Sequence, residues 1–252
     1  MSKNEAPARE HAAAGPEAGL DWTPWGLWAT VGLGLAVLLA SFVLQVVSAV
    51  PFVAENPAAI EDLQTDASYL ATAMLVSNVG CTLIILVLVA IRSGATIVGY
   101  LALRWPGWRV LLTWVVVAAL FVAALDVITH LLGREVVAEW WMDVYATVKQ
   151  PLFIGLATVI AAPLFEKAFF RGFLFSGLSR SRLGVTGTII VTAALWAVIH
   201  FQYGAYEIGQ IFVLGLLLGV ARHRTNSLIV PFTIHAAINL AANIQVAYMI
   251  QA

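Results

Sequence analysis

The chain has 252 residues, of which 61% are hydrophobic and 11% are charged, and its mean hydropathy is +0.91. Soluble domains carry about 25% charged residues, so this composition excludes them and indicates a polytopic membrane protein. The formal net charge of −1 gives no reason to expect nucleic acid as a partner, and the lipid bilayer is the expected one. The single cysteine, Cys81, excludes an intramolecular disulfide and a cysteine-rich metal site.

The chain opens with a polar segment, residues 1–22, whose Ala-, Glu- and Gly-rich composition predicts a disordered cytoplasmic tail. The apolar run that begins near Trp25 is too long for the core of a signal peptide, so we interpret it as a retained first span. A span needs roughly 20 mostly apolar residues. Seven segments meet this condition, near 25–50, 69–91, 109–132, 151–178, 184–200, 206–221 and 227–249. The sequence therefore predicts an all-α fold, a polytopic transmembrane helical bundle of about seven spans.

Basic residues alternate in number between the two sides of these spans. Nine precede the first span or lie in every second loop, namely Lys3, Arg9, Arg92, Arg104, Arg109, Arg180, Arg182, Arg222 and Arg224. The loops on the other side hold only Arg134 and Lys149. Because cytoplasmic loops carry the excess of Lys and Arg, the pattern predicts an integral protein of the plasma membrane with a cytoplasmic N-terminus and an external C-terminus.

Four polar side chains interrupt three of the apolar segments. Glu166 lies in the fourth segment, His200 ends the fifth, and the seventh contains His235 and Asn239. An ionisable group at mid-bilayer costs about 2.5–3.5 kcal/mol on insertion scales, so each such residue indicates a functional site. At 1.5 Å of rise per residue, the four lie roughly 12–24 Å from the cytoplasmic ends of their helices, so their depths overlap. A single intramembrane His or Asn is a structural partner in an interhelical hydrogen bond about as often as it is a functional residue. Four polar residues at one depth favour a water-activating active site.

Three other patterns allow more than one interpretation. Arg171 can pair with the glutamate five positions before it, contact an inner-leaflet phosphate, or snorkel toward the cytoplasmic interface. Asp126 and His130, four residues apart in the third segment, favour a structural pair or a rim contact over catalysis. Gly215 and Gly219 have small-xxx-small spacing, which favours packing within the bundle over a dimer seam and leaves the oligomeric state open.

The interrupted segments resemble the CPBP family, the CAAX proteases and bacteriocin-processing enzymes that are also called the Abi family. That family's pattern is Glu-Glu-x-x-x-Arg, then an aromatic residue four positions before a His, then His-x-x-x-Asn or Asp, on successive spans. The matching residues are Glu166 and Arg171, Trp196 and His200, and His235 and Asn239. The resemblance covers roughly residues 150–245. It divides the chain into N-terminal transmembrane helices over 23–149 and a CPBP-type catalytic transmembrane core over 150–249.

The resemblance implies an intramembrane endopeptidase. Glu166 with His200 would activate water for attack on a peptide bond, and His235 and Asn239 would stabilise the oxyanion, while Arg171, Lys167 and Trp196 support the site. The expected substrate is a membrane-associated peptide or protein, either a prenylated CAAX-type terminus or a leader peptide. The family has also been described as metalloendopeptidases, and Glu166, His200 and His235 are residue types that hold a catalytic zinc. The mechanism without a metal is the favoured interpretation.

Lys167 departs from the family pattern, which has its second glutamate at this position. Lys167 and Arg171 are four residues apart on a helix and bring like charges together, which is unfavourable in lipid. Three alternatives remain open: burial holds Lys167 uncharged, its side chain turns toward Asp126 or another acid, or the site is impaired. An impaired site leads to a second hypothesis, a peptide-binding, partner-binding or immunity protein. A third, a proton-coupled transporter, is disfavoured because no internal repeat is visible.

Overall fold

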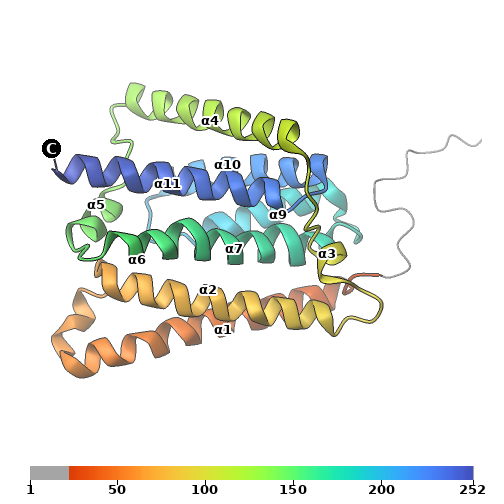
Figure 1. The fold of residues 1–252 in the computed structure, drawn as a ribbon, viewed down its shortest axis with the longest axis horizontal. Coiled ribbons are helices and arrows are strands. Elements are labelled where there is room, and N and C mark those ends of the chain that lie inside the picture. Colours follow the sequence, from red (N-terminus) through yellow and green to blue (C-terminus); the bar gives the residue numbers. More distant parts are fainter. Residues whose placement is uncertain (1–22, 252) are drawn as a thin grey trace, which may run out of the picture.

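A computed structural model describes residues 23–251, and over that range it contains helices and no strands (Figure 1). The predicted tail, residues 1–22, lies outside the described residues. The apolar helices are α1 (Leu27–Glu55), α2 (Ala67–Ala90), α4 (Trp108–Leu131), α6 to α8 (Pro151–Leu178, one continuous helix), α9 (Gly184–Val198), α10 (Ala205–Thr225) and α11 (Ile229–Gln251). All except α9, which has 15 residues, are long and apolar enough to cross a membrane. The predicted polytopic helical bundle is confirmed, and the protein is an integral membrane protein.

Short helices connect the spans at the two ends of the bundle. They are η1 (Pro57–Glu61), α3 (Ile97–Tyr100) and α5 (Glu139–Ala146). Side chains cap the N-termini of α2 and α3. Asp66 accepts a hydrogen bond from the backbone N–H of Tyr69 at 2.7 Å, and Thr96 accepts one from the backbone N–H of Gly99 at 3.0 Å. At the C-terminus of α10, Asn226 takes a left-handed conformation with φ of 46° and ends the helix. These turns place α3 at one end of the bundle and α5 at the opposite end (Figure 1).

The fourth apolar segment is the central helix of the bundle and runs between α2 and α11 (Figure 1). Its register changes four times, through α6 (Pro151–Gly155), the π-helix η2 (Leu156–Ala161), α7 (Ala162–Glu166), the π-helix η3 (Lys167–Leu174) and α8 (Phe175–Leu178). π-helical turns are rare and often occur at functional sites. Pro163 lies in the first turn of α7, two residues after the end of the first π-helical segment.

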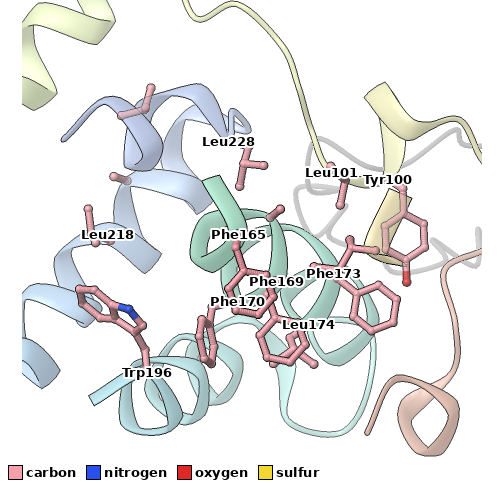
Figure 2. Close-up of a cluster of buried hydrophobic side chains, with 14 of the residues drawn as sticks. Tyr100, Leu101, Phe165, Phe169, Phe170, Phe173, Leu174, Trp196, Leu218 and Leu228 are labelled. Carbon is pink, nitrogen blue, oxygen red and sulfur yellow. The ribbon is translucent and has the colours of Figure 1, made fainter. Parts of the chain in front are cut away.

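Aromatic side chains of the central helix form the largest hydrophobic cluster (Figure 2). Phe165 stacks on Phe169 with ring centroids 5.6 Å apart, and Phe169 meets Phe170 edge to face at 4.9 Å. Both arrangements are favoured because the electron-rich ring faces avoid each other. Trp196 of α9 lies at one side of this cluster (Figure 2).

Glycines allow close contact between α9 and α10. A Cβ atom at Gly215 would lie 3.0 Å from the Cβ of Ala193, and one at Gly219 would lie 2.9 Å from Cγ2 of Ile189. Both neighbours belong to α9, so the small-xxx-small pattern of α10 packs inside this chain, as the sequence predicts.

Gly177 allows α8 to approach α1, and its replacement by alanine is expected to destabilise the protein. A Cβ atom there would lie 2.0 Å from Oγ1 of Thr30 and 2.7 Å from its Cγ2. Thr30 is fully buried and its hydroxyl donates to the Trp25 carbonyl at 2.9 Å, so it has little room to move. We expect Gly177→Ala to cost about 1–3 kcal/mol of the free energy of unfolding.

Thermal unfolding of the full chain in detergent checks this expectation. The matched control is Gly155→Ala in the same central helix, where a new Cβ meets no atom within 4 Å. Equal unfolding temperatures for the two variants would show that the contact between α1 and α8 is looser than described.

Candidate active site

Glu166, the last residue of α7, is at the centre of a buried polar cluster. Its Oε2 accepts a hydrogen bond from the indole Nε1 of Trp196 on α9. The same oxygen lies 3.5 Å from Nζ of Lys167 and 3.7 Å from Nδ1 of His235 on α11. Three helices distant in the sequence therefore bring Glu166, Lys167, Trp196 and His235 together, and the depths estimated for Glu166 and His235 agree with their contact.

The indole of Trp196 also contacts the cations of the site. Nζ of Lys167 lies 3.8 Å from the ring centroid, and Cζ of Arg171 lies 5.0 Å from it. An indole face attracts a cation electrostatically, and this attraction is larger where water is excluded. The Trp196 ring therefore offsets part of the repulsion expected between Lys167 and Arg171. Of the alternatives for Lys167, the structure shows the side chain turned toward an acid, but that acid is Glu166 and not Asp126.

Arg171 is fully buried and does not extend to the membrane surface. Its Nη2 donates a hydrogen bond to the carbonyl of Gly215 at 2.9 Å, so it ties the central helix to α10. The Arg171 carbonyl in turn accepts from Nε of Arg222 at 3.0 Å. Among the described residues, four buried nitrogen atoms have no hydrogen-bond partner: Nζ of Lys167, Nε and Nη1 of Arg171, and Nδ1 of His235. All four belong to side chains of this one cluster.

His200 reaches the cluster through Trp196. Its Nδ1 lies 2.7 Å from the Trp196 carbonyl, and the two rings meet edge to face with centroids 5.3 Å apart. A carbonyl oxygen can only accept, so Nδ1 carries the hydrogen, and in the neutral imidazole Nε2 is then an acceptor. His235 meets the same indole edge to face at 5.3 Å. The two histidines are thus arranged around one tryptophan.

Tyr203, in the loop between α9 and α10, was not among the predicted site residues. Its ring stacks on His200 with centroids 6.2 Å apart. Burial, together with the negative charge of Glu166, raises the pKa of the Tyr203 hydroxyl, so this group keeps its proton and remains a hydrogen-bond donor. No spacing pattern predicts Tyr203, because its position depends on the conformation of a short loop.

Asn239 lies one helical turn beyond His235 on α11, and its contacts differ from those of the cluster. Its Nδ2 donates to the backbone carbonyl of Thr158 in η2 at 2.8 Å. Asn243, one turn further, donates to the Asn239 carbonyl and accepts from the hydroxyl of Tyr145. The spacing of His235, Asn239 and Asn243, each four residues apart, was a usable signal for Asn243, whereas nothing in the sequence indicates the Thr158 carbonyl.

Asp126 and His130 lie on α4, outside the cluster. Asp126 lines a cavity of about 470 Å³ whose walls come mainly from α4 and α11, and Tyr203 lines it as well. His130 is exposed. Their assignment as a structural pair or rim contact stays a prediction.

The cluster does not have the form of a metal site. Between residues 23 and 251, no group of three or more His, Cys, Asp or Glu side chains is placed to hold a metal ion. The Glu166 carboxylate has instead an ammonium group and an indole N–H as neighbours. The zinc alternative, with Glu166, His200 and His235 as ligands, therefore does not fit this arrangement of side chains.

Comparisons with known proteins identify the part of the chain that contains this cluster. Residues 147–241 match the family model described as type II CAAX prenyl endopeptidase Rce1-like. An uncharacterised 24.3 kDa protein of Escherichia coli is 34% identical over 83 residues, which is 32% of this chain and 38% of that relative. No solved structure gives a significant match. The matched segment contains Glu166, Trp196, His200, His235 and Asn239. The family resemblance is confirmed over residues 147–241, which are similar to the Rce1-like family.

Proposed function

We propose that the protein is an intramembrane endopeptidase that hydrolyses a peptide bond in a membrane-associated peptide or protein. The observation that carries the proposal is the buried carboxylate of Glu166, which lies within the Rce1-like segment and has the indole N–H of Trp196, Lys167 and His235 around one oxygen. An ionised carboxylate inside an apolar helical bundle is costly, so chemistry is the expected reason for keeping it there.

In the proposed reaction, Glu166 accepts a proton from a water molecule as the water oxygen attacks the scissile carbonyl carbon. His200 assists as an acceptor at Nε2. The tetrahedral intermediate then collapses, the carbon–nitrogen bond breaks, and the proton passes from Glu166 to the leaving amine. The second hydrogen of the water stays on the new carboxyl group, so the products are a carboxylic acid and an amine, and no other reactant is needed.

The oxyanion of the intermediate requires hydrogen-bond donors that are in place before the reaction. Nζ of Lys167 and Nε and Nη1 of Arg171 are buried beside Glu166 without a hydrogen-bond partner among the described residues. His235 and the second N–H of Asn239 are the donors implied by the family resemblance. Removing one such donor typically lowers kcat by about 10²–10³-fold.

The proposed mechanism uses no metal. Nζ of Lys167 already lies 3.5 Å from Oε2 of Glu166, and Cζ of Arg171 lies 5.0 Å from the centroid of the Trp196 ring that Lys167 also contacts. A divalent cation among the same side chains would add repulsion to this arrangement. The cationic side chains supply the electrostatic stabilisation that zinc provides in metalloproteases.

The proposed location is the plasma membrane, with the N-terminus in the cytoplasm and the C-terminus outside. The helix ends near α3 carry most of the arginines of the connecting segments, including Arg92, Arg104, Arg109, Arg180 and Arg224 (Figure 1). The opposite end, near α5, carries Arg134 and Lys149. This asymmetry supports the orientation because cytoplasmic ends are the more basic.

The substrate class that the family suggests is a prenylated CAAX-type terminus, with a leader peptide as the alternative. Peptide termini in membranes from cells that express the natural chain can be compared with those from cells that lack it. Termini that appear only with the natural chain give the substrate and the cleavage site. Identical termini in both cell lines would contradict the proposed activity.

Lys167 favours a second candidate, a binding or immunity protein that keeps the family architecture without cleaving. The lysine occupies the place of the family's second glutamate and makes close contacts with Glu166 and Trp196. Under this hypothesis a deletion phenotype persists although no membrane protein changes its termini. Substitution of Lys167 by glutamate, the family residue, distinguishes the two candidates.

A further inference from the structure

The central helix presents one backbone carbonyl, that of Thr158, to helix α11. In an α-helix the N–H of residue 162 donates to the carbonyl of residue 158, four positions earlier. Here η2 is π-helical, and the N–H of Ala162 donates to Ala157 instead. The change of register therefore removes the α-helical donor of the Thr158 carbonyl.

Pro163 removes the alternative donor. In a π-helix the carbonyl of Thr158 would pair with the N–H of residue 163, five positions later. That residue is proline, which has no backbone N–H. Thr158 is buried, and a buried carbonyl without a donor is unfavourable because it has lost its water. A donor from outside the helix is needed.

Asn239 supplies that donor. Its Nδ2 lies 2.8 Å from the Thr158 carbonyl oxygen. The neighbouring contacts reinforce this arrangement, because Oδ1 of Asn243 accepts from Oγ1 of Thr158 at 3.2 Å and from the hydroxyl of Tyr145. An amide whose oxygen accepts two hydrogen bonds has its nitrogen directed the other way, and Nδ2 of Asn243 donates to the Asn239 carbonyl. The Thr158 hydroxyl also lies 2.8 Å from the Ile154 carbonyl, so its single hydrogen is shared between this carbonyl and Oδ1 of Asn243.

We propose that Pro163 is a positioning residue, which acts through the Thr158 carbonyl and Asn239 to set α11 against the central helix. The inference rests on the proposed function, because the residues it would align are those proposed to react. Glu166 lies three residues after Pro163, and His235 lies one turn before Asn239. The bond from Asn239 to Thr158 thus lies beside the contact in which Nδ1 of His235 is 3.7 Å from Oε2 of Glu166.

A double-mutant cycle on thermal unfolding tests the bond without any substrate. Asn239→Ala in the natural chain should lower the unfolding temperature of the full-length protein in detergent by about 2–4 °C, because a buried carbonyl loses its donor. In a Pro163→Ala background, residue 163 has an N–H that can donate to Thr158. The same Asn239→Ala change should then lower the unfolding temperature by less than half as much. Equal decreases in both backgrounds would overturn the proposal.

Kinetics with the substrate identified from the new termini test the positioning role. Pro163→Ala should lower kcat about tenfold and leave KM unchanged, as expected when reacting groups are misaligned without loss of substrate binding. The matched control is Pro51→Ala, a proline inside α1, which should change neither value. A Pro163→Ala variant with natural kcat would overturn the positioning role. A third outcome is that Asn239→Ala has a smaller effect in the Pro163→Ala background but the natural chain cleaves no substrate. That outcome would support the hydrogen bond from Asn239 to Thr158 and contradict the proposed function.

Discussion

Glu166→Gln is expected to abolish cleavage while leaving the fold intact. Glutamine has the same shape, and its side-chain carbonyl can still accept the hydrogen bond that Trp196 Nε1 donates to Glu166. It cannot accept a proton from water, however, and general-base catalysis contributes typically 10²–10⁴-fold to a rate. We therefore expect the rate of appearance of the new termini to fall by about that factor.

The unfolding temperature and a matched glutamate separate loss of chemistry from loss of structure. Glu61→Gln makes the same change at an exposed position in η1, and it should cleave at the natural rate. Glu166→Gln should unfold at a temperature close to that of the natural chain. A Glu166→Gln variant that cleaves like Glu61→Gln would show that another residue is the base.

Lys167→Met should have the second largest effect, and it should reduce both stability and cleavage. Lys167 is fully buried between the Glu166 carboxylate and the Trp196 ring. Methionine keeps the length and apolar stem of lysine but leaves the carboxylate without its nearest cation. Removing one partner of a buried ion pair costs about 3–5 kcal/mol because the other charge remains buried. Denaturant unfolding and cleavage rate, measured on the same preparations, check both parts of the prediction.

Lys167→Glu distinguishes a working enzyme from a degenerate one. The substitution restores the family residue but places a second carboxylate next to Glu166 in a site built around a lysine. Because two adjacent carboxylates cannot easily both be ionised, the proposed enzyme should cleave more slowly with this change. A large gain of cleavage would mark the natural chain as an impaired member of the family and would favour the binding hypothesis.

The sequence alone predicted that some residues of the cluster meet. Glu166 and His235 lie on long apolar helices with a constant rise per residue, so counting from the helix ends places them at similar depths. Trp196 and His200 are four residues apart near the end of α9, so the helical repeat places them on the same face. Depth was sufficient to predict that Glu166, His200 and His235 lie near one another, whereas Trp196 was expected only from the family resemblance.

Other features depend on contacts that no local pattern encodes. Lys167 resembles a misplaced charge in the sequence because its compensation comes from the ring face of Trp196, 29 positions away. The Thr158 carbonyl becomes an acceptor only through the π-helical register of η2, which a hydrophobic pattern cannot reveal. α1 continues through Pro51 to Glu55, beyond the expected end of the first span near residue 50, because a proline is tolerated in a membrane helix where other groups satisfy the freed carbonyl.

Hydrolysis in H₂¹⁸O under single-turnover conditions is the most direct test of water activation by Glu166. The purified full-length protein is used in excess over the substrate that the new termini identify, and the products are analysed by mass spectrometry. The proposed mechanism predicts one ¹⁸O atom in the new carboxylate after the first turnover and none in Glu166. An unlabelled product with ¹⁸O in the Glu166 carboxylate would show that this residue attacks the substrate itself. That result, or the absence of cleavage, would contradict the mechanism.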